Sequence, residues 1–177
     1  MAVSKQQSIE KIKTAQEFGI KYFGENKVQE AHKKTEAFNQ SSELHMIGHL
    51  QSNKAKKAVQ IFDVIQTVDS LKIATKINNA AKSINKTQRI YCQVNIANDV
   101  QKKGFNPENI YSSVDDIYKM SNLSIEGIMT ILPINLDDNS TKKHYNDTRR
   151  LKEKISATIN KKLELSMGMS SDYKIAV

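Results

Sequence analysis

Two short segments of the sequence carry groups that could bind an aldehyde and a phosphate. Lys5 directly follows the apolar run 2–4, and a lysine at the end of a strand becomes a nucleophile toward aldehydes once partial burial weakens its hold on a proton. The segment 168–172, GMSSD, follows another apolar run and is typical of a turn that opens a helix, where backbone N–H groups and serine hydroxyls bind phosphate. Two plainer alternatives stand beside this. Lys5 could be one of many surface lysines, and serines are common helix caps.

Other polar side chains near expected strand ends offer weaker signals. Asn26 could hydrogen-bond a ligand hydroxyl or simply satisfy the end of a strand. His45 and His49 are four residues apart around a strand end, without accompanying cysteines or carboxylates, so we expect no metal site. We expect His45 to be a hydrogen-bonded core histidine. Cys92, the only cysteine, lies in an apolar run without an acid–base partner and is expected in the core.

Composition and charge exclude several classes of protein. Among 177 residues, 38% are hydrophobic and 26% charged, which is typical of a globular protein, and no apolar run approaches the roughly 20 residues of a membrane span. The first residues show no signal peptide. The net charge of +8 comes mainly from scattered lysines, and the only arginines are Arg89, Arg149 and Arg150. We therefore expect a cytoplasmic protein with one domain that binds neither nucleic acid nor a membrane.

Apolar runs and amphipathic stretches alternate along the whole chain, and these elements must position the groups named above. The runs with strand character are 2–4, 20–26, 44–48, 63–68, 89–96, 124–132 and 163–167. The stretches between them with helical periodicity are 8–18, 28–38, 53–62, 73–84, a helix capped by Asn106 with Pro107 in its first turn, and 141–161.

This alternation predicts a parallel α/β sheet with helical crossovers. An open doubly wound sheet is one solution. We favour an incomplete (β/α)8 TIM-barrel-like fold, because the repeat is uniform, about seven units are present, and complete barrels need at least ~200 residues. In such barrels the chemistry lies at the carboxyl ends of the strands. Lys5, Asn26 and the segment 168–172 all occupy such ends.

Several motifs together resemble the YggS/PROSC family of pyridoxal phosphate homeostasis proteins. They occur in family order as AVSK, YFGENKVQEA, LHMIGHLQSNK, TVDSLKIA, QVNI with KKGF, EGIMTI and LSMGMSSD. The resemblance implies a modified TIM barrel similar to the N-terminal domain of alanine racemases. It also implies a non-catalytic protein that binds pyridoxal 5′-phosphate, a small-molecule cofactor, and acts in vitamin B6 and amino-acid homeostasis. Intact members are expected to be monomers.

The resemblance also implies roles for individual residues. Lys5 matches the lysine that holds the cofactor as an aldimine, and Asn26 matches a residue that lines the cofactor near its ring hydroxyl. Ser170, with the backbone around Met169, matches part of the phosphate site. No residue is assigned a catalytic role. His45, in the HxIG stretch, is expected to line and pack the strand.

The sequence departs from the family pattern in three places. His49 replaces the usual proline, from which we expect a modest change in loop stiffness. The family's initial helix and the start of its first strand are missing, and so are the eighth strand and the turn that would supply further phosphate contacts. We therefore expect residues 1–177 to form one domain truncated at both ends, which binds the cofactor weakly or not at all. Two alternatives stay open. The first is a non-functional fragment of the family, or a fragment that works only with a partner that supplies the last strand. The second is a racemase-like enzyme that uses pyridoxal phosphate.

Overall fold

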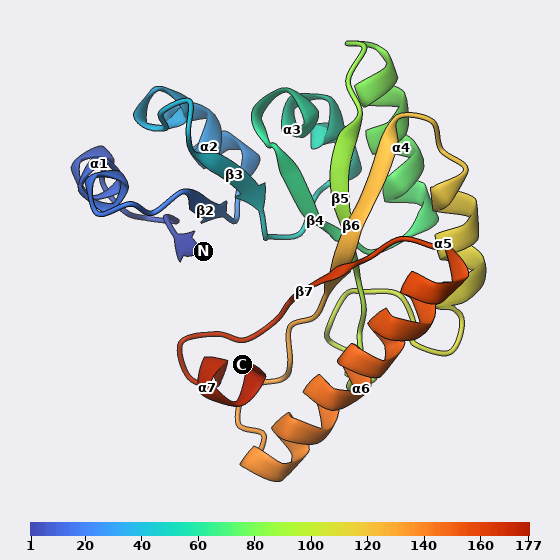
Figure 1. The fold of residues 1–177 in the computed structure, drawn as a ribbon. Helices are drawn as coiled ribbons and strands as arrows, with labels where there is room; N and C mark the ends of the chain where they lie inside the picture. Colours follow the sequence, from blue (N-terminus) through green and yellow to red (C-terminus); the bar gives the residue numbers. More distant parts are fainter.

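Seven parallel strands form one curled sheet in the computed structural model, which describes residues 1–177 (Figure 1). Their spatial order follows the chain, so each strand pairs with the next and β1 and β7 are the free edges. The strands are β1 (Ala2–Val3), β2 (Tyr22–Glu25), β3 (Glu43–Met46), β4 (Val64–Val68), β5 (Gln88–Gln93), β6 (Leu123–Met129) and β7 (Glu164–Ser166). This architecture confirms the incomplete TIM-barrel-like fold.

Helices follow the strands and cover the convex face of the sheet (Figure 1). They are α1 (Ile9–Glu17), α2 (Val28–Lys33), α3 (Ala55–Ile61), α4 (Leu71–Lys82), α5 (Ile110–Tyr118), α6 (Asp138–Thr158) and α7 (Tyr173–Ala176). Short 3₁₀ turns at Thr35–Ala37 and Ser52–Lys54 flank α2 and α3. Not one helix combines the length and the apolar character that crossing a membrane requires.

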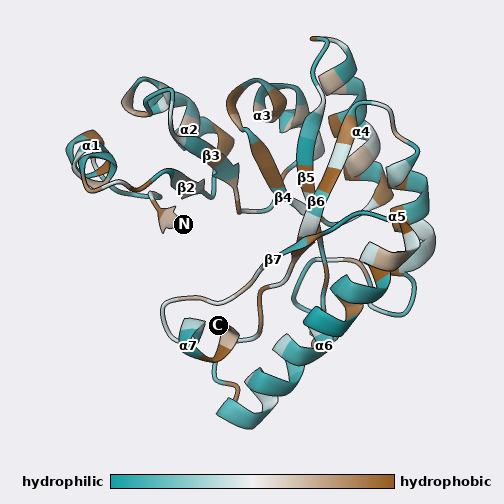
Figure 2. Ribbon diagram, viewed as in Figure 1, coloured by the Kyte–Doolittle hydropathy of each residue, from teal (hydrophilic) through white to brown (hydrophobic).

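The main core lies between the sheet and its helices, and the hydropathy colouring shows the apolar strands and the polar outer faces of the helices (Figure 2). Outward-facing strand residues such as Phe23, Ile65 and Ile90 are completely or almost completely buried there. Because side chains alternate along a strand, the neighbouring residues project onto the concave face. That face carries only a small apolar cluster of Val64, Tyr91 and Met129, and most of its other side chains are polar.

Two predicted helix starts are wrong, and side-chain capping explains both. Asn106 does not cap a helix, because its Oδ1 accepts the Glu108 N–H at 2.8 Å and closes a turn, so that α5 begins only at Ile110. The next helix, α6, begins three residues before the predicted Thr141. Asp137 is its cap and accepts the Ser140 N–H at 2.9 Å.

Candidate functional site

A buried ion pair between Glu25 and Lys34 lies next to the ends of β1 and β2. The side chain of Glu25 is fully buried, and its Oε1 accepts the Ser4 hydroxyl at 2.8 Å and Lys34 Nζ at 3.1 Å. Lys34, which directly follows α2, also donates to the Ser4 carbonyl at 2.9 Å and to Glu30 at 2.7 Å. Burial alone would lower the pKa of Lys34, but the hydrogen bonds to Glu30 and Glu25 raise it above its ordinary value. The cluster therefore fastens both strand ends to α2.

Lys5 occupies the turn that follows this cluster. Its predecessor Ser4 is held as described, and the N–H of its successor Gln6 donates to Glu30 Oε1 at 2.5 Å. Gln6 has a left-handed backbone with φ of 58°, which turns the chain sharply toward α1. The backbone on both sides of Lys5 is thus fixed, whereas its side chain is exposed and makes no hydrogen bond or ion pair.

The exposure of Lys5 corrects one expectation. The sequence predicted a partly desolvated lysine inside the mouth of a barrel. In the structure β1 is an edge strand of the sheet, with β2 on one side and no strand on the other, so solvent reaches the Lys5 side chain. The Lys5 amine is therefore open to solvent and has no hydrogen-bond or ion-pair partner in the protein.

Asn26 lies beside Lys5 at the end of the neighbouring strand. Val3 pairs with Gly24 and the Ser4 N–H donates to the Gly24 carbonyl at 3.0 Å, so the next residues of both chains continue side by side. Gly48, after β3, packs so closely that a Cβ there would overlap the Asn26 carbonyl oxygen. This contact holds the half-buried Asn26, whose side-chain amide makes no hydrogen bond.

The segment after β7 forms a turn before a helix, in a different way from that predicted. The serines do not open the helix, because α7 begins at Tyr173. Asp172 closes the preceding turn by accepting the Met169 N–H at 2.5 Å, and its other oxygen accepts the Tyr145 hydroxyl from α6 at 2.8 Å. The Met169 N–H, expected to contribute to a phosphate site, is therefore already occupied, and Met169 is 40% exposed.

Ser170 and Ser171 keep free donors in this turn. Both residues are exposed, and neither their backbone N–H groups nor the Ser170 hydroxyl donates to a protein acceptor. Gly168 precedes them with φ of 91°, and a Cβ there would come within 2.9 Å of the Ala176 Cβ. The glycine therefore allows α7 to fold back against the turn.

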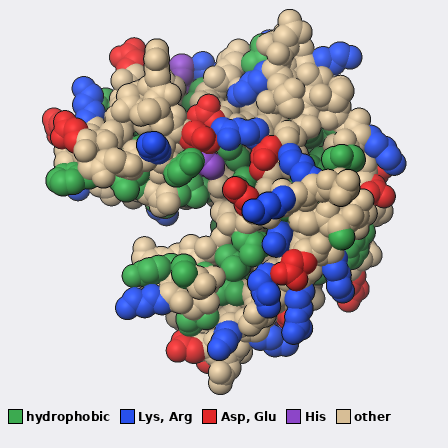
Figure 3. Space-filling model, in the orientation of Figure 1, with side chains coloured by type: hydrophobic (Ala, Val, Ile, Leu, Met, Phe, Trp, Pro, Cys, Tyr) green, Lys and Arg blue, Asp and Glu red, His purple; other side chains and the backbone are tan.

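The structure brings the predicted groups to two opposite edges of one curled sheet. Lys5 and Asn26 lie together at the β1 edge, whereas Met169 and Ser170 follow β7 at the other edge. A hollow opens between the part of the molecule around the N-terminus and α7 in the space-filling view (Figure 3; compare Figure 1). No hydrogen bond or ion pair joins the two groups across this hollow.

The sequence did not indicate a histidine–carboxylate pair that lies at the same carboxyl ends of the strands, which form the rim of the curled sheet. His49 Nδ1 lies 3.2 Å from Asp69 Oδ2, and the Asp69 side chain is only 8% exposed. Ser70 donates its hydroxyl to the other Asp69 oxygen at 3.1 Å and also caps α4. His49 was expected to change only the stiffness of a loop. The signal that could have revealed the pair is that both residues lie just after the ends of neighbouring strands.

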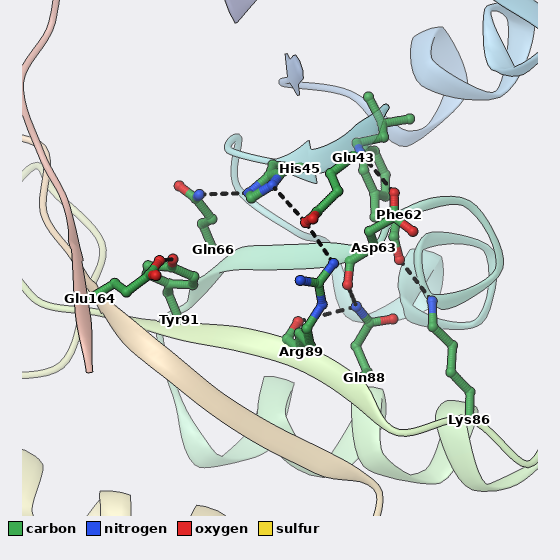
Figure 4. Close-up of polar contacts among 11 residues, drawn as sticks. Glu43, His45, Phe62, Asp63, Gln66, Lys86, Gln88, Arg89, Tyr91 and Glu164 are labelled. Atoms are coloured by element: carbon green, nitrogen blue, oxygen red, sulfur yellow. Dashed lines mark hydrogen bonds and ion pairs between the residues drawn. The ribbon is translucent and has the colours of Figure 1, made fainter. Parts of the chain in front are cut away.

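The concave face below the rim carries a connected polar network (Figure 4). The prediction that His45 is a hydrogen-bonded, buried histidine is confirmed, since Gln66 Nε2 lies 2.8 Å from its Nδ1. Burial lowers the pKa of His45. Cys92 points to the opposite, helix-covered face, where it is completely buried as predicted, and burial raises its pKa to about 12.

The rim groups that have no partner within the protein suit one kind of ligand. An exposed amine on a fixed backbone can react with a carbonyl carbon, the Asn26 amide can bond a hydroxyl, and the free N–H groups of Ser170 and Ser171 can donate to the oxygens of an anion. Together these groups are of the types that a phosphorylated aldehyde with a hydroxyl group would bind.

Comparison with known sequences points in the same direction. The family described as the alanine racemase N-terminal domain matches residues 1–176. The pyridoxal phosphate homeostasis protein of Synechocystis is 37% identical over 180 residues, which cover the whole chain and 83% of that protein. The protein of the same name from Schizosaccharomyces pombe is 34% identical and is covered to 76% of its length.

Solved structures show the same fold. PipY of Synechococcus elongatus, in a structure with pyridoxal phosphate bound, is 33% identical and superposes with a TM-score of 0.92 over 99% of this chain and 84% of PipY. Its structure without pyridoxal phosphate gives a TM-score of 0.94. An alanine racemase from Clostridium difficile is only 16% identical but has a TM-score of 0.83 and covers 97% of this chain, which shows likeness of fold.

Proposed function

Because this chain belongs to the pyridoxal phosphate homeostasis protein family, we propose that it binds pyridoxal 5′-phosphate at the rim of its sheet, with Lys5 as the attachment residue. The observation that carries the proposal is the state of Lys5, whose backbone is fastened on both sides while its amine has no partner. When bound, pyridoxal phosphate supplies an aldehyde that condenses reversibly with a primary amine.

The other rim residues have separate tasks in this proposal. Asn26, held by Gly48, directs its amide toward the ring hydroxyl of the cofactor. Ser170 and the backbone N–H of Ser171 bind the phosphate from the opposite edge of the sheet. The carboxylate of Asp172, already bonded to the Met169 N–H and Tyr145, keeps this turn in shape rather than contacting the anion.

We infer that the chain stores or transfers the cofactor without turning over a substrate. The homeostasis names of the relatives support this role. His49, oriented by Asp69, is a rim group of a type that transfers protons, and it makes a racemase-like enzyme the second candidate. The proposal also keeps the cytoplasm as the expected compartment, since the buried Cys92 is the only thiol.

Absorbance titration with pyridoxal phosphate tests the proposal. The wild-type chain should show a saturable change in the cofactor spectrum, and borohydride reduction followed by mass mapping should place one adduct on Lys5. Lys5→Ala should lose both signals. Lys21→Ala, which removes an exposed lysine at the opposite end of β2, is the matched control and should keep them.

Two results would contradict the proposal. The adduct could be spread over many lysines in both proteins, as for free cofactor with any lysine-rich surface. The Lys5→Ala variant could also retain the saturable spectrum. Incubation of the loaded chain with L-alanine separates the two candidate functions, because accumulation of D-alanine that is lost in His49→Gln would show the racemase-like enzyme instead.

A further inference from the structure

A second cavity lies on the concave face of the sheet, away from the rim. Its volume is about 290 Å³, and it is lined by the N-terminal Met1 and by side chains from β2 to β7, among them Glu43, His45, Arg89, Tyr91 and Glu164. Most of these residues lie in the first half of their strands, whereas Lys5 and Asn26 follow the strand ends. The cavity and the rim therefore occupy opposite ends of the sheet interior.

His45 presents an unpartnered donor to this cavity. Ser166 donates its hydroxyl to Gln66 Oε1 at 2.7 Å, which turns the Gln66 amide nitrogen toward His45 Nδ1 at 2.8 Å (Figure 4). Nδ1 is thus an acceptor, and the neutral ring carries its proton on Nε2. That nitrogen is buried without any hydrogen-bond partner, in a side chain that is only 9% exposed.

Glu43 does not satisfy this donor. Its Oε2 lies 3.7 Å from His45 Nε2, beyond hydrogen-bond distance, and instead accepts Arg89 Nη2 at 2.7 Å (Figure 4). The rest of the Arg89 guanidinium donates to no protein acceptor, and its side chain is 41% exposed. Two sets of free donors, on His45 and Arg89, therefore border the cavity and require an acceptor from outside the chain.

The opposite side of the cavity has a carboxylate without a cation. Three glutamates line the cavity, and Glu43 is paired with Arg89 while Glu126 is paired with Lys161 at 3.1 Å. Glu164 accepts only the Tyr91 hydroxyl at 2.6 Å and forms no ion pair. Burial, followed by this hydrogen bond, raises the pKa of Tyr91, so the phenol keeps its proton and donates it to the Glu164 carboxylate.

We propose that this cavity binds a small zwitterionic amino acid. Its carboxylate accepts from His45 Nε2–H and Arg89, and its ammonium group donates to Glu164. A simple anion would leave Glu164 without a cation, and a simple amine would leave the buried His45 donor unsatisfied. A ligand with both charges close together complements both sides of the cavity.

Glycine is the probe for this site, and the protein must be free of pyridoxal phosphate because that aldehyde reacts with amines. Nuclear magnetic resonance of the histidine rings reports binding, with the His45 signals identified by their loss in His45→Gln. Glycine should shift the His45 signals saturably. Acetate and methylammonium, which carry one half of the ligand each, should not saturate at the same concentrations.

Two variants locate the ligand charges. Glu164→Gln, at an exposed position of the edge strand, and Arg89→Gln should each weaken glycine binding at least about tenfold, the loss expected for one charge-assisted hydrogen bond. Arg149→Gln, on the exposed face of α6, is the matched control and should leave binding unchanged. Lys5→Ala should also bind glycine normally, so this site and the proposed cofactor site can fail independently.

Three outcomes would overturn the proposal. The His45 signals could fail to respond to glycine, which would mean that water alone satisfies Nε2. Acetate or methylammonium could saturate the site as tightly as glycine, which would mean that only one charge is recognised. Finally, Glu164→Gln could fold with the wild-type melting temperature and bind glycine with unchanged affinity.

Discussion

The hydroxyl of Ser166 on β7 donates a hydrogen bond of 2.7 Å to Oε1 of Gln66 on β4, although β5 and β6 separate the two strands in the sheet. Such a contact requires that the sheet curl until side chains of distant strands meet across its concave face. The bond also continues to His45 on β3. Three strands are thus joined across the interior of the sheet.

Removing this hydrogen bond should destabilise the fold. In Ser166→Ala the Gln66 Oε1, in a side chain that is almost fully buried, loses its only donor, which should lower the free energy of unfolding by about 1–3 kcal/mol. Equilibrium unfolding in urea measures the change. Ser171→Ala, at an exposed residue without a side-chain hydrogen bond, should stay within about 0.5 kcal/mol of wild type. Equal stability of the two variants would show that the contact contributes nothing.

Breaking the buried ion pair behind Lys5 should have a larger effect. Lys34→Met leaves the Glu25 carboxylate buried with only the Ser4 hydroxyl as a side-chain donor, so the free energy of unfolding should fall by about 3–5 kcal/mol. The control is Lys33→Met, which removes an exposed neighbour. Adding Glu25→Gln to Lys34→Met should recover part of the loss, because no charge then remains buried. If the double variant were no more stable than Lys34→Met, the buried charge of Glu25 would not be the cause of the lost stability.

Stability should fall in mild acid because of His45. Burial places the pKa of folded His45 below the ordinary value of 6.5, so the unfolded chain takes up this proton first as the pH falls. The free energy of unfolding should therefore decrease below about pH 6.5, with a slope of at most about 1.4 kcal/mol per pH unit from this proton, until the folded pKa is reached.

Urea unfolding of wild type and His45→Gln between about pH 7.5 and 5 tests this assignment. The variant should show the shallower acid slope, whatever its stability at neutral pH. His32→Gln, which removes an exposed histidine, should keep the wild-type slope. If His45→Gln keeps the wild-type slope as well, a group other than His45 causes the loss of stability in acid.

Crowding Asn26 should damage both stability and cofactor binding. In Gly48→Ala the new methyl group would overlap the Asn26 carbonyl oxygen, and such overpacking costs about 1–3 kcal/mol. Because the backbone of Asn26 must move, the saturable spectrum with pyridoxal phosphate should weaken too. Gly19→Ala has open space and bears only the cost of a positive φ of 81°, about 1 kcal/mol, so it should leave the spectrum unchanged. If Gly48→Ala gave the wild-type spectrum, Asn26 would not contribute to cofactor binding.

The sequence by itself determined the order and type of the elements. Apolar runs that alternate with helical periodicity are local signals, and they predicted seven parallel strands, an incomplete TIM-barrel-like sheet and the burial of His45 and Cys92. The motifs likewise selected Lys5, Asn26, Met169 and Ser170 as cofactor residues, and that selection stays a prediction. Local patterns were less reliable for the starts of α5 and α6, where single side chains decide which turn forms.

Only the tertiary structure decided which distant residues meet. The exposure of Lys5 depends on β1 being an edge strand, and the hydrogen bond of Asp172 with Tyr145 depends on how the segment before α7 packs against α6. The pair Ser166–Gln66 joins residues on two different strands, and the pair His49–Asp69 joins the segments that follow β3 and β4. No periodicity encodes such contacts, because they arise from the curvature of the sheet and the register of its strands, and these are properties of the packed molecule as a whole.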